Sequence, residues 1–82
     1  MVTDKQGEAA VPEIEQWASR IARSEDERVQ VRVYHDADSD TYVLRLARES
    51  RVLLFRLSEA QVRTPRREEE CEKTLRTKIN NL

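Results

Sequence analysis

The stretch that decides the fold runs from residue 29 to residue 57 and reads VQVRVYHDADSDTYVLRLARESRVLLFRL. Apolar and polar residues alternate in three short runs, over 29–35, 41–47 and 52–57, and β-branched and aromatic residues are frequent in all three. The links between the runs are short, so consecutive strands are expected to be antiparallel neighbours. This stretch therefore predicts a three-stranded antiparallel meander with the strand order 1-2-3.

The alternation divides the side chains of the meander between two faces. The predicted core face consists of Val29, Val31, Val33, Tyr42, Leu44, Leu46, Leu53, Phe55 and Leu57. The opposite face consists of Arg32, Tyr34, Val43, Arg45, Val52, Leu54 and Arg56. A sheet face that meets water is expected to be mostly polar, whereas this second face is half apolar.

Amphipathic helical patterns flank the meander on both sides. The first is predicted over Pro12–Ser24, with an apolar stripe of Ile14, Trp17, Ala18, Ile21 and Ala22. The second is predicted over Pro65–Asn80, with a stripe of Cys71, Leu75, Ile79 and Leu82. The fold class is therefore α+β, in the order α-β-β-β-α, with both helices packed on one face of the sheet.

Two shorter segments complete this division of the chain. Ser58 and Gln61 are spaced as a capping box, which predicts a helical turn before Pro65, and Thr64 is the expected N-cap of the second helix. Residues 1–10 have few apolar anchors and are predicted to be a flexible N-terminal tail. Residues 11–82 then form a single small domain.

Composition limits the possible functions. The chain has 82 residues, of which 38% are charged, and its net charge of −1 argues against binding driven by overall positive charge. A single cysteine excludes an internal disulfide. No signal-peptide pattern and no apolar run of membrane-spanning length is present, so we expect a cytoplasmic protein without a membrane association.

No pattern of residues predicts catalysis, a cofactor or a metal site. Asp36, Asp38 and Asp40 are spaced like the start of a calcium loop, but Thr41 and Ala47 stand where that loop needs Gly and Glu. The aspartates are better explained as turn residues. His35 could join them in a weak divalent site, and the preferred interpretation is a histidine at a strand end that faces solvent.

The half-apolar face leads to two hypotheses of function. Arginine, tyrosine and aliphatic residues are typical of protein–protein interfaces, so the first hypothesis is a non-catalytic module that binds protein, most simply a second copy of itself. The second is nucleic-acid binding. The element order resembles that of double-stranded RNA-binding domains in topology alone, and the acidic run after Arg66 and Arg67 would repel phosphates.

Overall fold

The computed structural model describes residues 1–82 and contains one antiparallel sheet of three strands. The strands are β1 (Gln30–Asp36), β2 (Thr41–Arg48) and β3 (Arg51–Ser58), in the order β1-β2-β3. On the central strand, Leu44 lies opposite Val33 of β1 and Phe55 of β3. The predicted meander, with its order 1-2-3, is confirmed.

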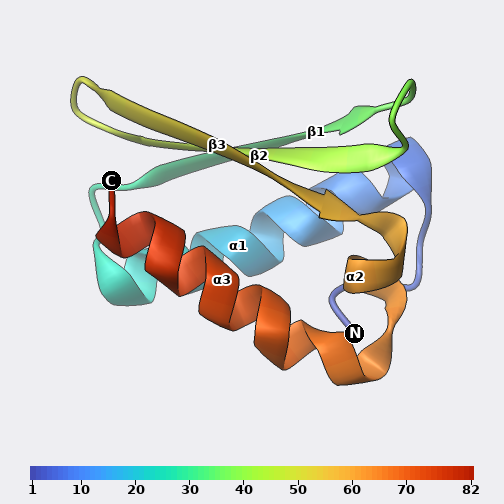
Figure 1. Cartoon of the computed structure of the whole chain (residues 1–82). Coiled ribbons are helices and arrows are strands. Elements are labelled where there is room, and N and C mark those ends of the chain that lie inside the picture. Colours follow the sequence, from blue (N-terminus) through green and yellow to red (C-terminus); the bar gives the residue numbers. More distant parts are fainter.

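Two long helices cover one face of this sheet, as Figure 1 shows. They are α1 (Val11–Glu25) and α3 (Glu68–Asn80), and they pack against each other beneath the strands. A short helix, α2 (Glu59–Arg63), and two 3-10 turns, η1 (Gly7–Ala10) and η2 (Pro65–Arg67), complete the chain. None of the helices has the length and apolar composition that a membrane crossing requires. The predicted α+β architecture with helices on one face is confirmed.

The core lies between the sheet and the two long helices and uses the predicted face. Seven of its nine predicted strand residues are buried, and Leu53 and Phe55 on β3 are partly buried. Trp17 lies among the buried residues of α1, as predicted. Because α1 packs beneath β1 and α3 packs against α1, the β3 side of the core is the less covered side.

The segment between β3 and α3 differs from the prediction of one helix that begins at Pro65. The Ser58–Gln61 capping box is present and starts α2, as expected. Thr64, however, makes no side-chain capping bond, and residues 65–67 form a 3-10 turn before α3 begins at Glu68. Proline lacks a backbone donor, so the chain turns tightly at this point before a regular helix is established.

The first ten residues lie against the domain, although the sequence shows few anchors there. The backbone N–H groups of Val2 and Thr3 both donate to the carbonyl of Val62, at 2.9 and 3.2 Å. The Thr3 side chain is buried and its hydroxyl donates to Glu13 at 2.7 Å. Ala10 is also fully buried. The anchors are mainly backbone groups and small residues, which hydropathy does not reveal.

Candidate interaction surface

The face of the sheet opposite the helices is uncovered, and we call it the open face. It carries the seven residues that the sequence assigned to it, Arg32, Tyr34, Val43, Arg45, Val52, Leu54 and Arg56. The register arranges them in rows across the strands, one of Arg32, Arg45 and Leu54 and the next of Tyr34, Val43 and Arg56. The structure therefore brings the predicted residues together on one face of the sheet.

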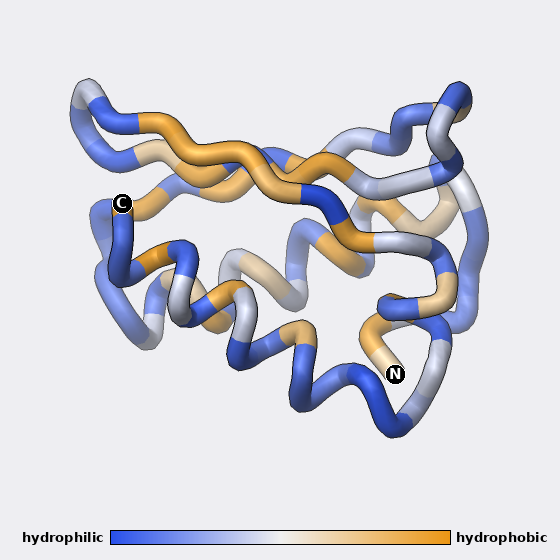
Figure 2. Tube along the Cα trace, in the orientation of Figure 1, coloured by the Kyte–Doolittle hydropathy of each residue, from blue (hydrophilic) through white to orange (hydrophobic).

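Three large apolar side chains on the open face are exposed. The exposed fractions are 50% for Tyr34, 51% for Val52 and 56% for Leu54. Figure 2 shows the hydrophobic run along β3, to which the last two belong. Apart from these three, the only large hydrophobic residue of the chain with comparable exposure is Met1. The apolar exposure of this domain is thus concentrated on one face.

Val43 is an exception among the seven, because it is 2% exposed. It lies on the central strand directly between Tyr34 of β1 and Arg56 of β3. Cross-strand neighbours are close enough for long side chains to cover a small one between them. The expectation that Val43 offers contact surface to a partner is therefore corrected. The Val43 side chain is covered, and it packs beneath the exposed side chains of the open face.

Arg56 is held by groups of its own chain. Its Nη1 donates to Asp36 Oδ2 and to Thr41 Oγ1, both at 2.9 Å. This bond from Arg56 is the main reason why the pKa of Asp36 lies below its ordinary value. Arg56 therefore ties β3 to the β1–β2 turn, and its charge already has a partner.

Arg32 and Arg45, in contrast, have no acidic partner. They are direct cross-strand neighbours on the open face, and both side chains are exposed. Neither forms an ion pair or a side-chain hydrogen bond within the chain. Like charges directly opposite each other destabilise a sheet, so this pair is unfavourable for the isolated domain.

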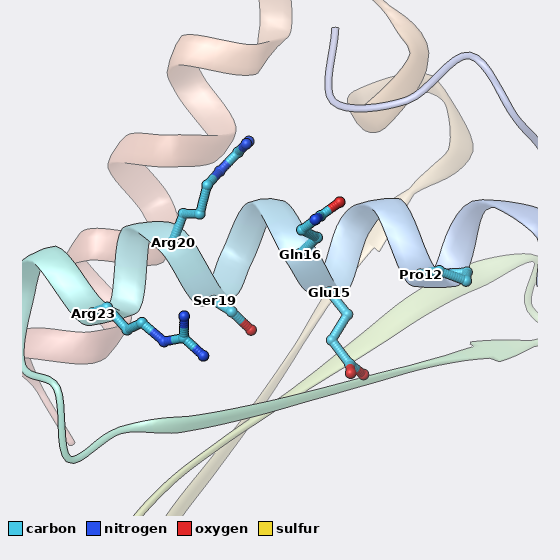
Figure 3. A pocket seen from close by; sticks show the side chains of 6 residues that line it. All are labelled: Pro12, Glu15, Gln16, Ser19, Arg20 and Arg23. Atoms are coloured by element: carbon cyan, nitrogen blue, oxygen red, sulfur yellow. The ribbon is translucent and has the colours of Figure 1, made fainter.

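The two edges of the sheet differ. On β1, the N–H of Val33 donates to Glu15 Oε2 of α1 at 3.0 Å, so a side chain occupies that edge. Figure 3 shows Glu15 pointing toward the strand beside a shallow hollow of about 570 Å³ whose lining contains no hydrophobic residue. Ligand pockets are mostly apolar, so this hollow is a poor candidate for a small-molecule site. No side chain bonds the backbone of β3 over residues 51–57, and that edge remains accessible.

A second group of polar side chains gathers beside the β1–β2 turn. His35 is 12% exposed in its side chain, stacks at a tilt on Tyr42, and places Nε2 3.1 Å from Asp40 Oδ1. The expectation of a solvent-facing His35 was wrong. The Tyr42 hydroxyl donates to Glu59 and accepts the Gly7 N–H at 2.9 Å. Glu59 belongs to α2, so its position beside His35 and Tyr42 could not be predicted from the spacing of these residues in the sequence.

Cys71 takes no part in either group. It is buried in the stripe of α3, and burial, followed by the charge of Glu70, raises the pKa of its thiol. A raised pKa disfavours the reactive thiolate.

These features define a small α+β domain that has one open, arginine-bearing sheet face. Comparisons of the chain with protein-family models, with curated proteins and with solved structures found no match.

Proposed function

We propose that this chain is a non-catalytic interaction module that forms a homodimer through its open face. The observation that carries the proposal is the concentration of Tyr34, Val52 and Leu54, each at least half exposed, on a sheet face that no helix covers. Exposed apolar patches of this kind mark interaction sites, and association would remove these side chains from water.

The arginines raise an objection, because equal faces bring equal charges together. The ion pair of Arg56 with Asp36 reduces the uncompensated arginines from three to two in each copy. Two sheets stack about 10 Å apart. A two-fold axis that lies between the sheets and runs across the strands, midway between the row of Arg45 and the row of Val43, places Arg32 over Tyr34 of the second copy. Guanidinium groups stack favourably on aromatic rings, so this arrangement relieves much of the repulsion.

Pairing of strand edges is the alternative geometry for a homodimer. Glu15 bonds the β1 edge at Val33, whereas no side chain bonds the backbone of β3 over residues 51–57, so β3 is the more suitable edge for pairing. Two copies of β3 would then extend the sheet across the two-fold axis. Edge pairing leaves the Leu54 side chain on the open face, outside the contact between the strands, and this distinguishes it from face stacking.

A nucleic acid is the second candidate partner, favoured by the uncompensated pair of Arg32 and Arg45 beside the exposed ring of Tyr34. Arginines grip phosphates, and an aromatic ring can stack a base. Tyr34 is the only aromatic side chain on the face, and the net charge of the chain is −1. We therefore favour protein as the partner.

A cytoplasmic setting, as expected from the sequence, is compatible with a lone buried cysteine.

Leu54→Glu tests the face directly, because it places a charge within the proposed contact. Gln16→Glu, on the exposed side of α1, is a matched control that adds the same charge far from the sheet. We expect Leu54→Glu to be a folded monomer and Gln16→Glu to dimerise like the parent. A Leu54→Glu protein that dimerises as the parent does would exclude face stacking and leave the β3 edge.

Heparin binding distinguishes the second candidate. Retention of the parent on heparin that is released by salt and lost in Arg32→Gln and Arg45→Gln variants would support the nucleic-acid function instead. A homodimerisation module is expected to pass through heparin without this dependence.

A further inference from the structure

We propose that His35, Asp40 and Glu59 form a binding site for a divalent transition-metal ion such as Zn²⁺. The site lies where the end of β1, the β1–β2 turn and the start of α2 meet, away from the centre of the open face. It is independent of the proposed homodimer.

The positions of the ligand atoms carry this inference. One ligand atom from each residue lies within 4.8 Å of the other two, and His35 Nε2 is 3.1 Å from Asp40 Oδ1. Two ligands at about 2.0–2.1 Å from Zn²⁺ in a tetrahedral site are about 3.4 Å apart. The His35–Asp40 pair therefore already has nearly the separation that two zinc ligands need. The Glu59 ligand atom, which lies within 4.8 Å of the other two, has to approach by up to about 1.4 Å.

Two of the three ligands are also well held. The side chains of His35 and Glu59 are 12% and 19% exposed, so each has lost most of its solvent contact. Glu59 accepts hydrogen bonds from the Tyr42 hydroxyl and from the Gly7 N–H, at 3.2 Å for the latter. Hydrogen bonds of this kind orient the carboxylates that bind metals. The second Glu59 oxygen, Oε2, forms an ion pair with Arg63 Nη1 at 3.5 Å.

The third ligand, Asp40, is the last residue of the β1–β2 turn. Its φ of 53° lies in the left-handed region, which aspartate and asparagine adopt more readily than most residues. The chemistry of the set also selects the ion. An imidazole nitrogen with two carboxylates suits zinc and its neighbours, whereas calcium prefers six or more oxygen ligands.

The test is a titration of the untagged full chain with Zn²⁺, read by the melting temperature. We expect the melting temperature to rise by about 10–20 °C when free Zn²⁺ is a hundredfold above its Kd. Asp40→Asn removes one ligand charge yet suits the same backbone conformation, and His35→Gln removes the nitrogen. Both are expected to lose most of the rise. Asp38→Asn, in the same turn and outside the cluster, is the matched control and should keep it.

Co²⁺ gives a second readout that does not depend on stability. A visible absorption band is expected for the parent and Asp38→Asn, and its loss for Asp40→Asn. His35→Gln is also expected to lose the band. If His35→Gln does not fold, the absorption of Asp40→Asn alone tests the site. An equal Zn²⁺ response in the parent and Asp40→Asn would overturn the proposal, as would the absence of any response in the parent.

Discussion

Arg32 and Arg45 face each other across β1 and β2, and neither has an acidic partner in the chain. Opposed like charges oppose folding of the single domain, so the pair is explained more readily by a contact with another molecule than by stability. Residues retained for binding often reduce the stability of the protein that carries them.

The first prediction concerns this pair. Arg45→Glu converts two opposed positive charges into an opposite-charge pair with Arg32, so we expect the free energy of unfolding to rise by about 0.2–1 kcal/mol. Urea unfolding at a concentration where the chain is monomeric measures this effect. A decrease in stability would show that Arg45 already has a favourable environment within the chain.

The second prediction concerns the core. Leu46 is fully buried on the central strand, so Leu46→Ala should lower the free energy of unfolding by about 2–5 kcal/mol. Phe55→Ala should have a smaller effect than its size suggests, because Phe55 is only partly buried. Leu54→Ala on the open face is the control and should change the stability of the monomer little. Equal effects of Leu46→Ala and Leu54→Ala would contradict the assignment of the two faces.

The third prediction concerns the N-terminal segment. Removal of residues 1–6 leaves the Val62 carbonyl without the N–H groups of Val2 and Thr3, and uncovers part of the core. We expect lower stability in urea and faster amide exchange in α2. If the truncated chain unfolds like the parent, residues 1–6 behave as the flexible tail that their composition indicates.

The fourth prediction concerns Tyr42. Burial, followed by the hydrogen bond to Glu59, raises the pKa of its hydroxyl from 10.0 to about 12. Because the pKa is higher in the folded chain, the contribution to stability is complete below pH 10 and is lost as the pH rises toward 12. Stability should therefore fall more steeply over this range in the parent than in Tyr42→Phe. Parallel curves for the two proteins would contradict the assignment.

The sequence was sufficient to predict the meander, both long helices and the division of the strands into two faces. Alternation and helical periodicity indicate which side chains are buried. The links between the three strands are so short that consecutive strands must be antiparallel neighbours. The sequence could not show that Val43 is covered, since that depends on Tyr34 and Arg56 lying on both sides of it. Nor could the sequence predict that Glu59 lies near His35, because this proximity depends on how α2 packs after β3.

The central claim is that two copies associate through the open face, and the oligomeric mass as a function of concentration tests it most directly. Sedimentation equilibrium should give twice the chain mass for the parent and for Gln16→Glu at high micromolar concentration, and a single chain mass for Leu54→Glu. A parent that keeps a single chain mass throughout this range would contradict the account.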